Sequence, residues 1–267
     1  MKIATWNVNS INKRIKLLLE FLEKEKIDVL CVQELKIGYN DFPVFDLKLA
    51  GYNSLCSCEN GKNGVAIISK YDMQLISNGF EQNSNREARF IAANIKTPDK
   101  NMSIGCVYVP VGGFKDFEDL TEEEITKWNH KLLFLRQFYG YLKKNPLDIV
   151  AGDFNMVSKI EDISDKLKQN FICCSPKERK IMYEFEKLGY DNVYNVLYPQ
   201  KVAYSWWSYQ FGYYTSNLGY RLDHILCRQN KFKYSNIDIK HEHWRSVDNA
   251  SDHAPVVLEF EFFNEKE

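Results

Sequence analysis

Three short segments of the sequence combine acidic, amide and imidazole groups. They read Gly-Asp-Phe-Asn at 152–155, Arg-Leu-Asp-His at 221–224 and Ser-Asp-His-Ala-Pro at 251–255. Taken singly, each is also typical of an ordinary turn, because Asp, Asn and Ser side chains readily bond nearby backbone groups. Taken together, they supply what hydrolysis of a phosphoester requires: hard oxygens for a divalent cation, a base for the attacking water, and donors for the pentacovalent oxyanion.

A further carboxylate, Glu34, stands directly after a strand pattern that ends at Gln33. Packing gives a carboxylate no reason to occupy such a position, whereas hard divalent cations prefer oxygen ligands of this kind. The alternative is an ordinary surface salt bridge with Lys36, two residues further on. We favour the interpretation of Glu34 as a metal ligand.

Several predicted strands deliver a polar side chain at the point where their apolar run ends. The patterns at 3–9, 27–34, 147–155 and 219–226 carry, in that order, Asn7 with Asn9, Glu34, Asp153 with Asn155, and Asp223. Polar groups that leave strand ends for loops are how a rigid sheet positions a reactive site.

Helical patterns lie between these strands. Apolar stripes predict helices over 11–26, 124–144 and 177–188, and Pro146 marks the end of the second. The mixture of hairpin and crossover connections favours a layered α/β or α+β sandwich with more than one sheet, and periodicity leaves the number of layers open. Because no linker rich in Pro, Ser or Gly interrupts the pattern, we interpret residues 1–267 as a single domain.

The composition is that of an ordinary globular protein. The 267 residues carry 35 Lys and Arg against 36 Asp and Glu, so the net charge of −1 indicates no particular partner. No apolar run approaches the length of about 18 residues that a transmembrane helix needs, and the N-terminus enters a strand pattern at once. We therefore expect neither a membrane segment nor a signal or transit peptide.

The seven cysteines indicate a reducing compartment. Their number is odd, and Cys31, Cys106 and Cys227 lie in apolar runs where buried free thiols are expected. No Cys-x-x-Cys pair is present, which argues against a structural zinc site.

Seven short strings occur in the order found in exonuclease III type abasic-site endonucleases, and the resemblance extends over essentially the whole chain. They are TWNVNS at 5–10, VQELK at 32–36, YVP at 108–110, GDFN at 152–155, YSWWSY at 204–209, GYRLDHIL at 219–226 and SDHAPV at 251–256. The chain also resembles the wider endonuclease/exonuclease/phosphatase superfamily related to DNase I. That resemblance implies a four-layer α/β/β/α sandwich, with two mixed sheets flanked by helices.

The resemblance also implies roles for individual residues. Asp153 would activate the attacking water or orient a metal-bound hydroxide, and Asn155 would hold that carboxylate and contact the phosphate. Tyr108 would donate to the phosphate or stabilise the oxyanion. His253, oriented by Asp223, would bond a nonbridging phosphate oxygen. Asn7 would be a supporting amide. The cofactor would be Mg²⁺, with Mn²⁺ as an alternative, and its ligands would come from Glu34, Asn9, Asp153, Asn155, Asp252 and His253.

An aromatic pocket is expected beside Asp223. Trp206, Tyr220 and Leu222 would form its walls, so that a sugar lacking its base could enter while a normal nucleotide would be too large. Alternation along a strand sends Trp206 and Trp207 to opposite faces, so one of the two is expected in the core. We favour Trp206 as the pocket residue.

Two further groups of residues bear on DNA binding. Local DNA contacts are expected from basic residues in predicted loops, namely Lys36, Lys62, Arg86, Arg89 and Lys115. Val111 stands where the family usually carries an amide, which puts one DNA or phosphate contact in doubt, and Asn192 and Asn195 stand where family members usually have an Asp and then an Arg, at structural or DNA-facing positions.

The expected activity is Mg²⁺-dependent hydrolysis on the 5′ side of an abasic site in duplex DNA, leaving a 3′-hydroxyl and a 5′-deoxyribose phosphate. Activity at 3′-blocked ends, as a 3′-phosphodiesterase, 3′-phosphatase or 3′→5′ exonuclease, is expected alongside. We expect a monomer that acts on chromosomal DNA in a bacterial-type cytoplasm. Two alternatives stay open: a phosphodiesterase for a lipid or RNA substrate, and a DNA-binding protein without catalysis.

Overall fold

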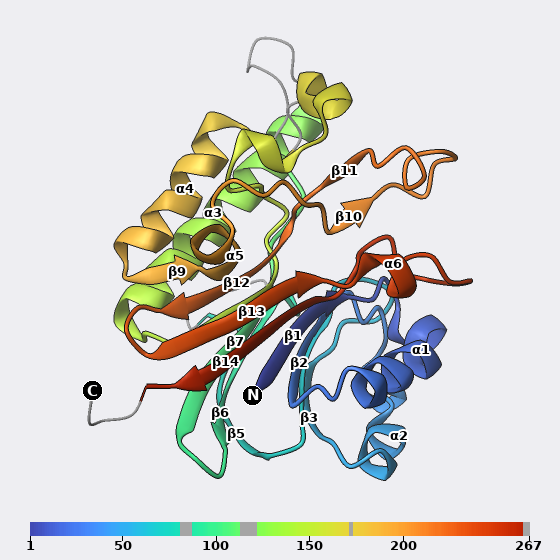
Figure 1. The fold of residues 1–267 in the computed structure, drawn as a ribbon, viewed down its shortest axis with the longest axis vertical. Coiled ribbons are helices and arrows are strands. Elements are labelled where there is room, and N and C mark those ends of the chain that lie inside the picture. The colour runs from blue at the N-terminus through green and yellow to red at the C-terminus, as the bar shows by residue number, and fades with distance from the viewer. Residues whose placement is uncertain (81–86, 113–121, 171–172, 264–267) are drawn as a thin grey trace.

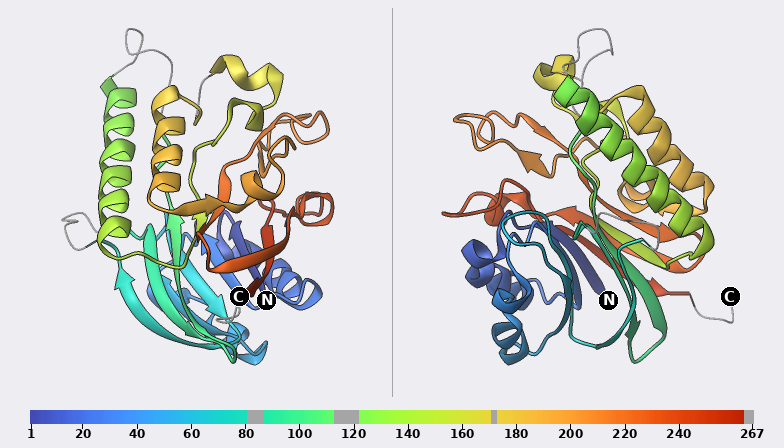
Figure 2. Two further views of the ribbon diagram at one scale, coloured as in Figure 1. Left: turned by 60° about the vertical axis from the view of Figure 1, so that its left-hand side comes forward. Right: turned by 180° about the vertical axis from the view of Figure 1, so that it is seen from behind.

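Two six-stranded sheets pack face to face, and helices cover the outer face of each (Figure 1). The computed structural model describes residues 1–80, 87–112, 122–170 and 173–263. The two views of Figure 2 show the same four layers from other sides, with α3 and α4 on one sheet and α1 and α2 on the other. Among the described residues, none of the helices is both long and apolar enough to cross a membrane.

The first sheet has the strand order β13-β14-β1-β2-β4-β3. Within it β1 runs parallel to β2, and the other neighbouring strands are antiparallel. Helices α1, α2 and α6 lie on its outer side, where Trp6, Phe21 and Trp244 pack edge to face. The bounds are β1 Lys2–Asn7, α1 Ile11–Lys24, β2 Val29–Gln33, α2 Val44–Leu49, β3 Asn53–Ser57, β4 Val65–Ser69, β13 Phe232–Ile239, α6 His241–Trp244 and β14 Val256–Phe262.

The second sheet has the order β5-β6-β7-β8-β12-β9, with β7 parallel to β8. Helices α3 and α4 cover its outer face, and a separate two-stranded sheet, β10 with β11, stands beside it. The bounds are β5 Asp72–Asn78, β6 Phe90–Lys96, β7 Asn101–Tyr108, α3 Glu122–Lys144, β8 Ile149–Asp153, α4 Pro176–Lys187, β9 Tyr190–Asn192, α5 Val193–Leu197, β10 Trp206–Trp207, β11 Gly219–Tyr220 and β12 Asp223–Arg228. Short 3-10 helices cover Tyr39–Asp41, Ile160–Asp162 and Asp165–Asn170.

Both faces of the central strands are buried, which explains their nearly continuous apolar sequences. Along β2, Cys31 packs between the two sheets, while the adjacent Leu30 packs under the helices of the first sheet. Along β8, Ala151 and Val150 alternate in the same way. This alternation follows from the two-residue period of a strand, so the register of each strand is fixed by burial on both sides.

The structure confirms the four-layer α/β/β/α sandwich expected from the resemblance. The predicted helices 11–26, 124–144 and 177–188 correspond to α1, α3 and α4, with ends that differ by one or two residues. α1 ends at Lys24, before Lys26 takes a φ of 54° that no α-helix can continue. All seven cysteines are free, and Cys31, Cys106 and Cys227 are buried. The single domain over residues 1–267 stays a prediction.

A buried polar network lies under α5, centred on His224 of β12. Nε2 of His224 lies 2.8 Å from the carbonyl oxygen of Met156, and Nδ1 lies 3.1 Å from Nδ2 of Asn192. Arg221 contributes a further contact to Nδ1 at 3.4 Å. Burial and the neighbouring guanidinium lower the pKa of His224 to about 3, so the imidazole is neutral, with Nε2 as donor and Nδ1 as acceptor.

This neutral histidine makes stability depend on pH. Since the unfolded chain takes up the proton near pH 6.5 and the folded chain only near pH 3, acid favours the unfolded state. We expect His224 to reduce the free energy of unfolding by about 1.4 kcal/mol per pH unit below about pH 6. Urea unfolding of wild type and His224→Gln at several pH values measures the difference. The exposed His243→Gln variant is the control and retains the wild-type slope; an unchanged slope in His224→Gln contradicts the assignment.

Candidate active site

The polar ends of strands from both sheets meet at one edge of the sandwich. In the second sheet, Tyr108 of β7 pairs in register with Asp153 of β8, and Asp153 pairs with Asp223 of β12. In the first sheet, β1 ends at Asn7, beside Gln33 at the end of β2. The side chains that the sequence marks as reactive are therefore brought together by strand register.

Gly152 makes the approach of β7 and β8 feasible. A Cβ atom at this position would lie 1.9 Å from the carbonyl oxygen of Val107, so no larger residue fits without moving the strands apart. Glycine before Asp153 is thus required by the close backbone contact. This explains the first residue of the Gly-Asp-Phe-Asn string.

Asp153 is buried and held by amides on both carboxylate oxygens. Oδ1 accepts the backbone amide of Asn155 at 2.8 Å, and Oδ2 accepts Nδ2 of Asn7 at 2.9 Å. Burial raises the pKa of Asp153 to about 7; the charge of His253 opposes this rise and that of Asp223 adds to it. A carboxylate that titrates near neutral pH is suited to accept a proton from water.

His253 and Asp223 form a buried pair next to Asp153. Nδ1 of His253 lies 2.8 Å from Oδ2 of Asp223, which also accepts the hydroxyl of Ser205 at 2.7 Å. Nε2 of His253 lies 3.7 Å from Oδ2 of Asp153. Burial alone would lower the pKa of His253, but the carboxylates of Asp223 and Asp153 raise it to about 10. The imidazole is therefore positively charged at neutral pH.

Glu34 lies on the opposite side of Asn7 from Asp153. Its Oε1 accepts Nδ2 of Asn7 and the hydroxyl of Tyr108, each at 2.9 Å, and its Oε2 pairs with Nζ of Lys36 at 2.5 Å. Burial would raise the pKa of Glu34, but the bonds from Asn7 and Lys36 outweigh it and lower the pKa. Glu34 is thus a carboxylate at neutral pH, and the salt bridge considered as its alternative role is present.

Asn9 and Asp252 extend the same row of oxygens. Nδ2 of Asn9 donates to Oδ1 of Asp252 at 3.0 Å, and Oδ1 of Asn9 accepts Nζ of Lys36 at 2.6 Å. The indole of Trp206 donates to Oδ2 of Asp252 at 2.9 Å. Burial would raise the pKa of Asp252, but His253, Trp206 and Asn9 lower it.

The oxygen atoms of these side chains are suited to bind a divalent cation. The ammonium of Lys36 bonds both Glu34 and Asn9, so the oxygens predicted to bind a metal already face a positive charge. Separately, ligand atoms of Asp153, Asp223 and His253 lie within 4.8 Å of one another. Oδ1 of Asp223 is buried and has no hydrogen-bond partner among the described residues. Carboxylate and amide oxygens are the ligands that Mg²⁺ and Mn²⁺ accept, so the acidic and amide side chains at this edge of the sandwich form a candidate metal site.

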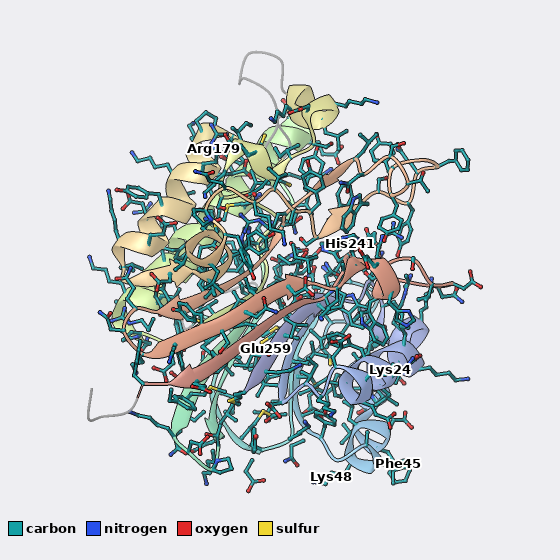
Figure 3. All side chains as sticks on the ribbon, in the orientation of Figure 1. Lys24, Phe45, Lys48, Arg179, His241 and Glu259 are labelled. Atoms are coloured by element: carbon teal, nitrogen blue, oxygen red, sulfur yellow. The ribbon has the colours of Figure 1, made fainter. Side chains whose placement is uncertain are left out.

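A cavity of about 390 Å³ opens beside this cluster. Asp153 and His253 lie at one side of it, and Trp206, Tyr220 and Leu222 form an apolar wall. Trp207, by contrast, is buried in the core between the sheets, with its ring 5.4 Å from that of His241. Figure 3 labels His241, just below the position of β10 in Figure 1. Glu34, Asn155, Asp252 and Val111 also line the cavity, and the lining residues that the sequence did not single out are Leu167, Cys173, Ser208, Gln210 and Tyr213.

The basic residues expected to contact DNA are engaged within the protein. Besides Lys36, Lys62 pairs with Glu59 at 2.9 Å, and Arg89 pairs with Glu87 while its guanidinium lies over the Tyr108 ring. The predicted contacts at Arg86 and Lys115 lie outside the described residues.

The three departures from the family pattern have definite places. Val111 lines the cavity. Asn192 contacts His224, and Asn195 accepts a bond from the buried Arg221 at 2.7 Å. The two asparagines therefore belong to the polar network under α5, which has a structural role.

Two supporting residues escaped the sequence analysis. Ser205 donates to Asp223 and accepts the backbone amides of Leu222 and Asp223, which orients the carboxylate. Arg14 of α1 is buried and donates to the carbonyl oxygens of Asn9 and Ala250. Ser205 lies in a string noted above, whereas Arg14 carries no signal that separates it from the other charged residues of its helix.

A sequence profile of the endonuclease/exonuclease/phosphatase family matches residues 4–253. The chain belongs to this family. It is 29% identical to exodeoxyribonuclease III of Haemophilus influenzae, over 97% of this chain and all of that protein. The family predicted from the seven sequence strings is thereby confirmed.

Solved structures agree with this placement. An AP endonuclease from Archaeoglobus fulgidus is 31% identical, with a TM-score of 0.85 over 98% of this chain and 99% of that one. A 3′-5′ exonuclease from Neisseria meningitidis is 28% identical, with a TM-score of 0.86 over 98% of this chain and all of that one. The fold is thus shared along the whole length with nucleases of both names.

The charge on His253 can be measured directly. In metal-free protein, we expect the imidazole to stay protonated through pH 8, and Asp223→Asn to lower its pKa because the paired carboxylate is lost. Nitrogen chemical shifts of labelled histidine, followed against pH, report the protonation state. Asp248→Asn serves as the control and leaves the titration unchanged. A wild-type His253 that titrates near pH 6.5 would contradict the assignment.

Proposed function

We propose that the protein hydrolyses the phosphodiester bond on the 5′ side of an abasic site in duplex DNA, leaving a 3′-hydroxyl and a 5′-deoxyribose phosphate. The observation that carries this proposal is the apolar cavity directly beside Asp153 and His253. Relatives named exodeoxyribonuclease III and AP endonuclease support DNA as the substrate and hydrolysis as the reaction. Removal of blocking groups from 3′ ends is part of the same proposal, supported by a relative whose structure is described as a 3′ phosphatase bound to a product DNA hairpin.

The cavity suits a sugar that has lost its base. Trp206, Tyr220 and Leu222 offer apolar surface to the sugar ring. The indole of Trp206 also donates to Asp252, so the apolar wall of the cavity is hydrogen-bonded to a predicted metal ligand. Selection of an abasic site is proposed to rest on this wall together with the lower unstacking cost of a nucleotide that has no base.

In the proposed reaction, one residue accepts the proton of the water and other residues bind the phosphate. Asp153 accepts the proton of the attacking water, and Asn7 and Asn155 hold its carboxylate in place. The Nε2–H of His253 bonds a nonbridging phosphate oxygen, and its positive charge offsets the charge that collects there. Burial and the neighbouring carboxylates of Glu34 and Asp153 raise the pKa of Tyr108, so its hydroxyl keeps the proton and serves as a donor.

Mg²⁺ is the proposed cofactor, with Mn²⁺ as an alternative. Its ligands would come from Glu34, Asn9, Asp252, Asp153 and Asn155, with Glu34 as the principal one. His253, the remaining member of the predicted set, is left out because its protonated ring has no free nitrogen lone pair. When bound, the cation neutralises negative charge on the phosphate. Lys36 bonds Glu34 and Asn9 in this structure, and with a cation bound to those oxygens it would be available to a DNA phosphate.

The remaining parts of the proposal concern the partner and the setting. Arg89, Lys62 and, outside the described residues, Arg86 are proposed to contact the DNA backbone near the cavity. The protein is proposed to act as a monomer on chromosomal DNA in a bacterial-type cytoplasm, which accords with bacterial relatives that match nearly the whole chain.

Incision of a defined duplex tests the proposal. A labelled duplex with one tetrahydrofuran abasic analogue, which cannot break by β-elimination, is incubated with the protein in Mg²⁺ and in EDTA. We expect a single cut 5′ to the analogue in Mg²⁺ and none in EDTA or on undamaged duplex. Asp153→Asn is expected to lower the rate by about 10² to 10⁴ fold, because the base is lost.

Asp148→Asn is the matched control, since Asp148 lies just before β8, at the end opposite Asp153, and bonds Ser103. It is expected to leave the rate unchanged. Binding of the duplex without incision would contradict the hydrolytic role. Faster cleavage of a phosphoinositide, a sphingolipid or RNA would contradict the choice of substrate.

A further inference from the structure

Lys131 and Glu178 form a buried ion pair behind the active site. They lie on α3 and α4, which run side by side on the outer face of the second sheet in Figures 1 and 2. Both side chains have 0% exposure, and Nζ of Lys131 bonds Oε1 of Glu178. Arg179, labelled in Figure 3, marks this end of α4. Neither residue lines the cavity.

The ammonium of Lys131 uses each of its three protons on a different oxygen. Besides Glu178, it donates to the carbonyl oxygen of Asn155 at 2.6 Å and to that of Gly112 at 3.1 Å. Asn155 follows β8, and Gly112 follows β7. A single cation therefore fastens the two loops that leave the strands of Asp153 and Tyr108.

The conformation of the loop at Asn155 sets the position of Asp153. Its φ of 47° is in the left-handed region, which asparagine adopts more readily than most other residues with a side chain. In this conformation the backbone amide of Asn155 bonds Oδ1 of Asp153, and its side chain bonds the carbonyl oxygen of Val109 at 2.9 Å. A bond that holds the carbonyl of Asn155 thereby holds the carboxylate of Asp153.

Glu178 connects the same pair to the wall of the cavity. Its Oε2 accepts the backbone amide of Ser175 at 2.8 Å, and Oγ of Ser175 accepts the amide of Glu178 at 3.3 Å. This capping box starts α4 two residues after Cys173, which lines the cavity. Cys173 has a φ of 60° and its carbonyl oxygen accepts the amide of Val157. The Lys131–Glu178 pair is therefore bonded both to Ser175, two residues after Cys173 in the cavity lining, and to the loop at Asn155.

Stability is a weak reason for such a pair. Removing two charges from water is costly, and apolar residues of similar size often replace a buried ion pair without loss of stability. Apolar side chains cannot, however, donate to the carbonyl oxygens of Asn155 and Gly112. We propose that Lys131, with Glu178 as its counter-ion, is a positioning residue that holds Asn155, and through it Asp153, in the orientation needed for hydrolysis. This inference rests on the proposed function.

The double variant Lys131→Met/Glu178→Met separates positioning from stability. Both charges are removed together, so no unpaired charge is left buried, and we expect a folded protein with a Tm close to that of wild type. We expect kcat for incision of the tetrahydrofuran duplex to fall on the order of 100-fold, with little change in KM. Leu142→Ala is the matched control on the same helix: it loses stability and keeps its kcat, because it leaves Asn155 untouched.

A second measurement does not depend on activity. The side-chain amide of Asn155, identified by its loss in Asn155→Asp, is followed by hydrogen exchange in metal-free protein. We expect slow exchange in wild type and in Leu142→Ala, and faster exchange in the double variant. If the wild-type protein does not incise the duplex but the exchange pattern is as expected, the proposed function is refuted and the positioning role is not. A double variant with wild-type kcat and wild-type exchange would overturn the positioning role.

A second variant covers the case in which the double methionine variant does not fold. Lys131→Gln/Glu178→Gln keeps polar groups in the site, but the shorter amide cannot reach both carbonyl oxygens. We expect it also to lower kcat and speed the exchange of the Asn155 amide. Wild-type values for both measurements in this variant would overturn the proposal.

Discussion

The contact between His253 and the carboxylates of Asp223 and Asp153 is the interaction on which the rest of the site depends. All three groups are buried, and a buried charge is tolerated only where an opposite charge or several hydrogen bonds compensate it. Within this trio His253 supplies the positive charge, and the bonds from Ser205, Asn7 and Asn155 supply the remainder. The neighbouring carboxylate of Glu34 is paired with the ammonium of Lys36.

The two sheets provide the rigidity that this arrangement requires. Tyr108, Asp153 and Asp223 are neighbours across three adjacent strands, so their separation is set by hydrogen bonds between the strands. Sliding any of these strands by one residue would turn its polar end into the core. Burial on both faces makes that slip costly, and Gly152 allows the close approach at the critical point.

Much of this could be predicted from the sequence. The apolar runs indicated which residues end strands, and the order of the motifs indicated a fold whose strand ends meet. Alternation predicted that Trp206 and Trp207 would separate, and the cavity receives the first while the core receives the second. The resemblance supplied the four layers, which periodicity left open.

Other features could not be predicted because they depend on contacts between distant segments. Lys131 and Glu178 are 47 residues apart in the sequence and read as ordinary charged positions on two helices. The same holds for Arg14, two of whose partners, the carbonyl oxygens of Asn249 and Ala250, lie 235 and 236 residues further along the chain. Long-range partners of this kind are visible only in the folded chain. Lys62 and Arg89 differ from them, because each pairs with a glutamate two or three residues before it, a local ion pair that selection by charge alone did not consider.

A crystal structure of Asp153→Asn with Mg²⁺ and a duplex containing the tetrahydrofuran analogue would decide between the interpretations most directly. We predict that the sugar lies in the cavity against Trp206, Tyr220 and Leu222, and that the phosphate on its 5′ side is bonded to His253. A duplex whose analogue stays stacked in the helix, or whose phosphate lies away from His253, would contradict the proposed roles of the cavity and of His253.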